Sequence, residues 1–304
     1  MIRNPNRGCR TALWVLMLVS PSLAACGGPF SPTQPPGSNL IQVVAAENFY
    51  GDIVQQLGAG HVSVVSILSD PNVDPHEYES GIQNGVAVAR AQLVIENGSG
   101  YDSWMDKLIS ASPNSRRIVV VAYDICGEKL PDNPHVWYSV ADIMTVARAV
   151  TADLEQLQPA YAREFDAALA KFDASLDPII EKLAELETKY SGTPIGLTES
   201  IFLYQSGPMG LKVLTPFEFE KAIAEGNDPP AITVVAANNQ IRLHQIKLLI
   251  YNSQTVTPIT TNLESEAELN HIPIVPVSET MPPGKNYQSW MLGQLVALQA
   301  ALAP

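Results

Sequence analysis

The sequence predicts an α/β protein with two lobes, each a mainly parallel sheet flanked by helices, joined by one long connecting helix. Short runs rich in Val and Ile alternate with helical patterns in both halves of the 304-residue chain. Strands separated by helices favour parallel pairing with right-handed crossovers. A long amphipathic stripe between the halves predicts the connecting helix.

In the first half, apolar runs of strand length alternate with segments of helical periodicity. The expected strands are residues 41–46, 61–68, 91–98 and 116–125. The expected helices are residues 49–57, 79–91 and 103–110, and the pattern is again helical from Ser139. We expect these elements to form a first lobe over residues 41–155.

Residues 156–190 are expected to form the connecting helix. Apolar side chains recur there at steps of three and four, as one helix face requires. They are Tyr161, Phe165, Leu169, Phe172, Leu176, Ile180, Leu183 and Leu186. Because proline lacks a backbone N–H, we expect a kink or short break at Asp177-Pro178.

The second half returns to the α/β pattern and should form a second lobe over residues 191–304. The expected strands are residues 193–200, 246–252 and 272–277, and the expected helices are residues 217–226, 230–244, 260–270 and 287–302. Ligands of open parallel sheets bind beyond the carboxyl ends of the strands. In a two-lobed protein, both sets of strand ends should therefore face a shared cleft.

The first 25 residues have the features of a signal peptide. Three arginines precede a short apolar run, TALWVLMLVS, which is too short to span a bilayer. The sequence LAAC that follows resembles the lipobox of a bacterial lipoprotein, which predicts cleavage before Cys26 and lipidation of its thiol. An ordinary signal peptide with a cysteine after its cleavage site is the alternative.

Residues 26–40 are rich in Gly, Pro and Ser and predict a flexible tether after the lipidated cysteine. The mature protein should therefore lie outside the cytoplasm, anchored to the cell membrane by lipid without spanning it. Cys126 would then have no intramolecular disulfide partner, and we expect a structural, semi-buried thiol.

The charge balance argues against a nucleic-acid partner. Without the three arginines of residues 1–25, the chain has 15 basic and 31 acidic residues, a formal charge of −16. Phosphate binding requires a basic surface, whereas an acidic surface favours cations. Acidity also keeps an exported protein soluble, so charge alone does not predict a metal site. We expect a monomer.

Two of the five histidines follow a proline in separate loops. His76 lies in DPHEYE after the second expected strand, and His135 lies in NPHVWYS ahead of a helix. Proline stiffens the loop that presents each ring, and neutral imidazole is a good ligand for divalent transition metals. Taken singly, either histidine is more often an ordinary surface residue. His61, His244 and His271 have structural or exposed positions in the predicted pattern.

Two acidic residues complete a candidate metal site from the second lobe. Glu199 ends the strand TPIGLTE, and Glu279 follows the strand IPIVPV. Both occupy expected carboxyl ends of strands, where the cleft should lie. Either glutamate alone could equally be a solvated acid at a strand end or a helix cap. Together with His76 and His135 they could clamp one metal ion between the lobes.

At these residues the chain resembles the cluster A-I metal-binding lipoproteins, the substrate-binding proteins of bacterial zinc and manganese ABC importers. DPHEYE and NPHVW resemble the two histidine motifs of that family, and ENGSGYDSW resembles its turn after the third strand. TESIFLY resembles the motif of the third ligand, here Glu199. The fourth ligand of the family is usually an aspartate, and here SETMPPG offers Glu279 instead, with Glu225 and Asp228 as alternatives.

The resemblance covers residues 41–303 and implies capture of Zn²⁺ or Mn²⁺ outside the membrane and delivery to an ABC permease. The connecting helix of the family implies a limited closure of the lobes. Two histidines with two carboxylates lean toward manganese, although the Irving–Williams order still favours zinc in an isolated site.

Two other functions remain open at the level of sequence. A surface adhesin or interaction lipoprotein would need no metal cargo. A zinc-dependent hydrolase would need an open coordination position and a general base. No HExxH run occurs in the chain, and four protein ligands would fill a tetrahedral shell. A binding protein, not an enzyme, is therefore the favoured prediction.

Overall fold

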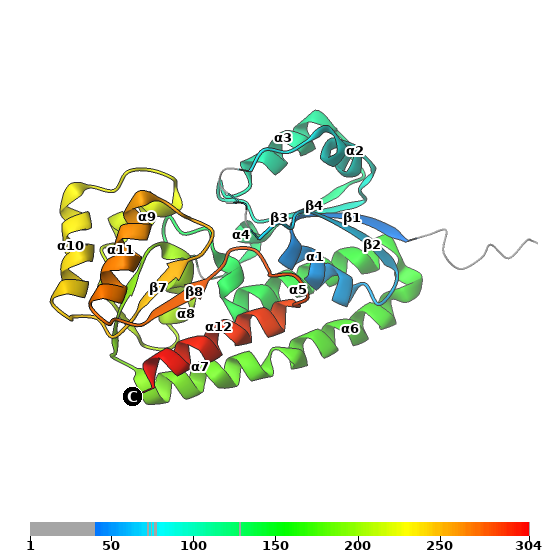
Figure 1. The fold of residues 1–304 in the computed structure, drawn as a ribbon. Helices are drawn as coiled ribbons and strands as arrows, with labels where there is room; N and C mark the ends of the chain where they lie inside the picture. Colours follow the sequence, from blue (N-terminus) through cyan, green and yellow to red (C-terminus); the bar gives the residue numbers. More distant parts are fainter. Residues whose placement is uncertain (1–39, 72, 74, 76–77, 128, 304) are drawn as a thin grey trace, which may run out of the picture. The chain divides into compact units, whose positions relative to one another are not determined.

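The computed structural model describes residues 40–303 except residues 72, 74, 76, 77 and 128. These residues belong to one compact unit, Asn39–Pro304. The described residues form two four-stranded parallel sheets with helices packed against them (Figure 1). The predicted fold class is therefore confirmed. The predicted lobe boundaries stay a prediction, and the predicted signal peptide, Cys26 and most of the tether lie outside the described residues.

The first sheet has the strand order β2-β1-β3-β4. Its strands are β1 (Ile41–Glu47), β2 (Val62–Leu68), β3 (Leu93–Glu96) and β4 (Ile118–Val121). All of its pairings are parallel, with Val43 opposite both Val64 and Leu93. Residues rich in Val and Ile fit such strands because their branched side chains pack well on a sheet that is covered on both faces.

The two faces of this sheet pack against different helices. Along β1, Ile41, Val43 and Ala45 belong to the main core, whereas Val44 and Ala46 belong to a second cluster with Trp104 of α3. This alternation follows from the two-residue period of a strand. In Figure 1, α2 and α3 cover one face of the sheet, and α1 and α5 cover the other. The helices of this half are α1 (Asn48–Leu57), α2 (Ile82–Arg90), α3 (Ser103–Ala111), α4 (Ala122–Ile125) and α5 (Val140–Leu157).

The predicted strand 116–125 is too long at both ends. β4 stops at Val121, and Ala122–Ile125 forms the short helix α4. The neighbouring strand β3 ends at Glu96, which pairs with Val121. β4 is an edge strand, so beyond Val121 no strand remains to accept its backbone hydrogen bonds, and the apolar run turns into a helix.

The expected connecting helix consists of two helical segments in succession. After a short 3₁₀ turn (Pro159–Tyr161), α6 spans Ala162–Ser175 and α7 spans Asp177–Tyr190. Figure 1 shows the two segments end to end along one side of the unit. The break at Leu176 agrees with the predicted interruption, because Pro178 cannot donate to the preceding turn.

One position after the break differs from the predicted buried stripe. Ile180 was expected in the buried stripe, but it is 43% exposed, and Ile179 is fully buried instead. Tyr161, the first residue of the stripe, is also partly exposed. The stripe otherwise continues into α7, since Leu186 is fully buried and Leu183 packs against the same core.

The second sheet has the strand order β6-β5-β7-β8, again with parallel pairings. Its strands are β5 (Pro194–Leu197), β6 (Lys212–Val213), β7 (Leu249–Asn252) and β8 (Ile274–Val277). The two-residue strand β6 was not predicted, because two residues carry no measurable period. The helices of this half are α8 (Leu203–Ser206), α9 (Phe217–Ala224), α10 (Ala231–Arg242), α11 (Pro258–Leu269) and α12 (Tyr287–Leu302), with 3₁₀ turns at Val136–Tyr138 in the first half and Ser200–Phe202 here.

One hydrophobic core joins the two halves. It includes Val43 of the first sheet, Leu197 of the second, and Leu186 and Leu295 of α7 and α12. Helices α7 and α12 lie side by side in Figure 1. Across the described residues, no helix combines the length and the apolarity needed to cross a membrane.

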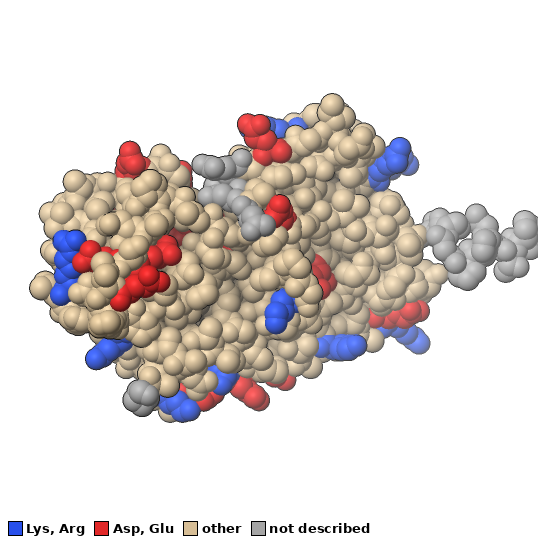
Figure 2. All heavy atoms as spheres, in the orientation of Figure 1, with Lys and Arg blue, Asp and Glu red and all other residues tan. Residues whose placement is uncertain are grey.

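Charged residues are unevenly distributed over the surface that Figure 2 shows. Acidic side chains gather over α11, which carries Glu264, Glu266 and Glu268, on the face drawn in Figure 2. Arg242 of α10 forms an ion pair with Glu266 at 2.9 Å. The other basic side chains on this face stand singly or in small groups.

The neighbouring isoleucines of α7 test the observed register. Ile179→Ala should lower the free energy of unfolding by about 2–5 kcal/mol, because it leaves a cavity in the core. Ile180→Ala should cost about 0.5–1 kcal/mol, because that side chain keeps much of its contact with water. Urea denaturation of both variants measures the difference, and equal losses would mean that Ile179 is not the buried residue of the pair.

Candidate metal centre

The second sheet presents two glutamates at adjacent strand ends. Glu199 comes two residues after β5, and Glu279 comes two residues after β8. β7 lies between these strands and ends at Asn252. Because the carboxyl ends of parallel strands lie at one edge of a sheet, the three side chains meet although they are up to 80 residues apart in sequence.

His135 enters from a loop of the other half of the unit. Asn133 Oδ1 accepts hydrogen bonds from the backbone N–H of His135 at 3.1 Å and from the ring Nδ1 at 2.8 Å. An amide oxygen can only accept, so Nδ1 carries a hydrogen, and in the neutral form of the ring the lone pair lies on Nε2. The amide nitrogen of Asn133 donates to the carbonyl of Ser200 at 2.8 Å, next to Glu199.

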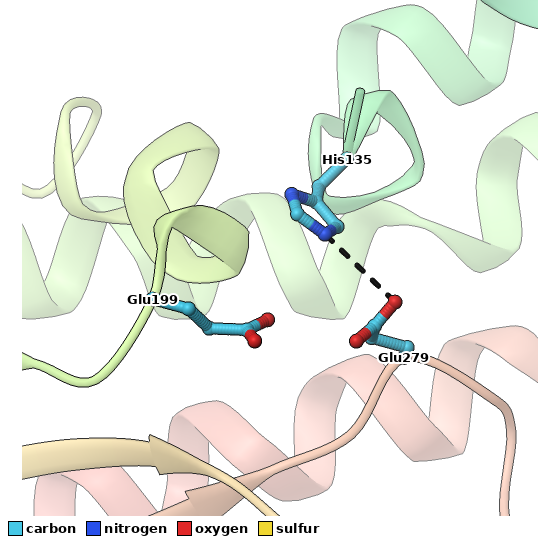
Figure 3. A group of neighbouring side chains, drawn as sticks. All are labelled: His135, Glu199 and Glu279. Carbon is cyan, nitrogen blue, oxygen red and sulfur yellow. Dashed lines mark ion pairs between the residues drawn. The ribbon is translucent and has the colours of Figure 1, made fainter. Parts of the chain in front are cut away.

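The three side chains converge on one point, as Figure 3 shows. One ligand atom from each of His135, Glu199 and Glu279 lies within 4.8 Å of the others. Nε2 of His135 is 3.9 Å from Oε2 of Glu279. Zinc ligands at about 2.0–2.2 Å from the ion lie roughly 3–4 Å from one another. The group is therefore close to the spacing of a metal site and would have to contract only slightly around an ion.

The imidazole and the two carboxylates of this group are shielded from water. All three side chains are at most 1% exposed. The rings of Tyr101 and Trp137 stand edge-on to His135, with centroids at 6.0 and 5.1 Å. Burial, together with the charge of Glu279, raises the pKa of the Tyr101 hydroxyl well above its ordinary value. Two carboxylates in such surroundings favour a bound cation.

A family model for the zinc-uptake complex component A periplasmic (ZnuA) matches residues 43–301, which is most of the chain. The chain belongs to this family. Among similar curated proteins, the manganese-binding lipoprotein MntA of Halalkalibacterium halodurans is 26% identical over 180 residues, covering 57% of this chain and 56% of MntA. The manganese ABC transporter substrate-binding lipoprotein PsaA of Streptococcus anginosus is 24% identical over 217 residues, covering 66% of this chain and 68% of PsaA.

Solved structures support the fold over a larger part of the chain. The periplasmic zinc-binding protein TroA of Treponema pallidum has a TM-score of 0.75 at 19% identity, covering 86% of this chain and 99% of TroA. The sequence alignments are shorter. In them, this chain spans a little more than half the length of the first relatives it matches. The names of these ZnuA-family relatives describe binding proteins, not enzymes.

The remaining predicted ligand, His76, lies outside the described residues. The two alternatives to Glu279 do not join the group of three. Glu225 forms an ion pair with Lys221, and Asp228 is exposed. Of the three acids considered for the fourth position, it is Glu279 that lies beside Glu199 and His135.

The other histidines have separate surroundings. His61 stacks on Tyr161 and pairs with Glu164 at 2.8 Å, so it ties the start of β2 to α6. His244 and His271 are exposed in turns with positive φ, at 50° and 56°. The prediction placed His244 on a helix, but α10 ends at Arg242.

Two polar residues near the group of three, Asn252 and Glu220, were not predicted from the sequence. Asn252 could have been found, since it ends a predicted strand as Glu199 does. Glu220 of α9 is 1% exposed, and burial together with the charge of Glu199 raises its pKa well above the ordinary value. No signal in the sequence marks Glu220, because burial of one face of α9 depends on its tertiary neighbours.

The first half holds a second set of buried acids. Glu47 ends β1 and Glu96 ends β3, at the same edge of the first sheet, near Asp102. Burial, followed by the charge of Asp102, raises the pKa of Glu96 to about 8. Burial also raises the pKa of Asp102 to about 6, although the backbone N–H groups of Asn97 and Gly98 donate to its carboxylate.

Cys126 is buried and forms no disulfide within the described part of the chain. Burial, with the nearby charge of Asp142, raises the pKa of its thiol to about 12. The thiol therefore stays protonated at neutral pH and is a poor nucleophile. This agrees with the expected structural role.

The raised pKa of Glu96 predicts a pH dependence of stability. Between its ordinary value of 4.5 and about 8 the folded protein holds a proton that the unfolded chain releases. Stability contributed by this group is therefore lost as pH rises through that window, at up to about 1.4 kcal/mol per pH unit.

Urea denaturation at several pH values between 5 and 8 measures this loss. Glu96→Gln should make the free energy of unfolding fall less steeply, whereas the exposed Glu218→Gln should follow the parent protein. Parallel curves for all three proteins would show that Glu96 is ionised in the fold.

Proposed function

We propose that this chain is the extracytoplasmic binding component of an ABC importer that captures Zn²⁺ or Mn²⁺ between its two lobes and delivers it to a membrane permease. The observation that carries the proposal is the convergence of His135, Glu199 and Glu279 within 4.8 Å in a buried position. Membership of the ZnuA family and the metal-binding names of its relatives support the same conclusion.

The ligand atoms fit a divalent transition metal. Nε2 of His135 supplies a neutral nitrogen, and Glu199 and Glu279 supply anionic oxygens. His76, predicted from sequence, would be the second imidazole. The two negative charges of such a set balance the charge of the ion. Metal binding therefore offsets the desolvation cost of burying two carboxylates.

Capture and release would follow from the origin of the ligands. His135 belongs to a loop of the first half, and both glutamates follow strands of the second sheet. A small separation of the halves would lengthen the bonds from His135 while leaving the glutamates in place. The ion could then leave without unfolding of either sheet.

The location follows from the amino terminus. Residues 1–25 would direct export, Cys26 would carry the lipid, and residues 27–40 would tether the binding unit to the membrane. The names of the relatives MntA and PsaA include the word lipoprotein, which supports this assignment.

Loss of His135 should abolish tight metal binding. We expect the parent protein to hold about one Zn²⁺ or Mn²⁺ per chain after mild purification. His135→Ala should weaken metal binding by more than about 100-fold, or about 2.8 kcal/mol. The exposed His244→Ala is the matched control and should keep the parent stoichiometry and affinity.

Elemental analysis and competition titration with a chelator give both quantities. A parent protein without metal affinity would contradict the proposal and favour an adhesin. Hydrolytic turnover that depends on the metal would instead indicate an enzyme. A loss of affinity in His244→Ala would point to adventitious binding by surface histidines.

A second substitution tests the fourth ligand. Glu279→Gln keeps the shape of the side chain but removes its charge, so metal affinity should fall by about 10- to 100-fold. Glu225→Gln, at one of the alternative positions, should leave affinity within about twofold. Isothermal titration of both variants decides between them, and the reverse order would move the ligand to Glu225.

A further inference from the structure

One amide group touches both carboxylates of the candidate metal centre. Nδ2 of Asn252 lies 2.9 Å from Oε1 of Glu199 and 2.6 Å from Oε1 of Glu279. It is also 2.8 Å from the hydroxyl of Thr255. Two amide hydrogens serve these three acceptors, and the bonds to charged oxygens are the stronger ones.

The orientation of this amide is fixed by its other contacts. Oδ1 of Asn252 accepts the backbone N–H of Gln254 at 3.0 Å, so the nitrogen must face the glutamates. The backbone N–H of Asn252 donates to the hydroxyl of Thr198 at 3.1 Å. The residue is 2% exposed and ends the strand that lies between β5 and β8.

The backbone around Glu279 is held by Gln254, two residues after Asn252. Oε1 of Gln254 accepts the backbone N–H groups of Glu279 and Thr280, at 2.7 and 2.9 Å. Its Nε2 donates to the carbonyl of Val73 in the first half, at 3.0 Å. Asn252 and Gln254, both in the sequence YNSQT, therefore position the two glutamates. Neither amide side chain carries a charge, so neither can be an anionic ligand itself.

We propose that Asn252 sets the metal selectivity of the centre by holding one oxygen of each glutamate. With Oε1 engaged by the amide, each carboxylate presents Oε2 to the ion. Oε2 of Glu279 is the oxygen that lies 3.9 Å from Nε2 of His135. This inference rests on the proposed function, since it concerns the same site.

The consequence is a small coordination number. With one oxygen from each glutamate, the two carboxylates contribute two ligand atoms instead of four beside Nε2 of His135, which is compatible with the four-coordinate geometry of zinc. Manganese prefers octahedral surroundings with more oxygen, which the two carboxylates could supply only by binding through both oxygens. Asn252 thus counteracts the preference for manganese that a set with two carboxylates has on composition alone.

Substitution of Asn252 separates this role from a purely structural one. Asn252→Leu keeps the branching of the side chain but removes its hydrogen-bond donors, and Asn252→Ala removes the group entirely. Asn238 of α10, whose amide donates to the carbonyl of Val234 in its own helix, provides the control Asn238→Leu. Zinc and manganese affinities are measured by competition titration, with thermal unfolding to verify the fold.

We expect the ratio of zinc to manganese affinity to fall by about tenfold or more in Asn252→Leu and Asn252→Ala. The control should keep the parent ratio. An unchanged ratio in a folded variant, whether or not both affinities fall, would overturn the inference and leave Asn252 a structural residue. A parent protein that binds neither metal would instead refute the proposed function.

The parent protein gives an independent measurement if neither variant folds. Co²⁺ bound in place of zinc should show the intense visible absorption of a four-coordinate ion. The weak absorption of a six-coordinate ion would overturn the inference, because it would mean that the carboxylates are not limited to one oxygen each.

Discussion

The candidate metal centre depends on one constraint, that the carboxyl ends of parallel strands lie at a common edge of their sheet. β5, β7 and β8 are neighbours in the second sheet, and their ends bring together Glu199, Asn252 and Glu279. No local sequence contact could do this, since the three residues are separated by 53 and 27 positions. Long-range strand pairing, and not loop conformation, therefore sets the spacing of the two glutamates.

The same arrangement is costly for the folded protein. Carboxylates that leave water for a buried site lose hydration, and two of them repel each other. Asn252 offsets part of this cost with its two N–H groups, and Asn133 orients the ring of His135 that faces them. A cation of charge two offsets the rest, so binding of a metal should also stabilise the fold.

Contacts between the two halves connect the site to the rest of the molecule. Asn48 of α1 exchanges hydrogen bonds with the backbone of Met281, close to Glu279. Tyr204 donates to the carbonyl of Asn133, and Asn133 donates to Ser200 next to Glu199. These hydrogen bonds, together with the shared core that runs through α7 and α12, connect the candidate site to both halves.

The sequence by itself determined the α/β class, the parallel sheets and the positions of Glu199, Glu279 and His135 at strand ends or in a proline-stiffened loop. These features depend on local periodicity and on the residues that end each run. Tertiary structure decided where β4 stops, which isoleucine of α7 is buried and which acids share the interior, because each depends on a neighbour distant in sequence. It also decided that Asn252 lies between the two glutamates: the order of strands in a sheet follows from packing, and no single strand encodes it.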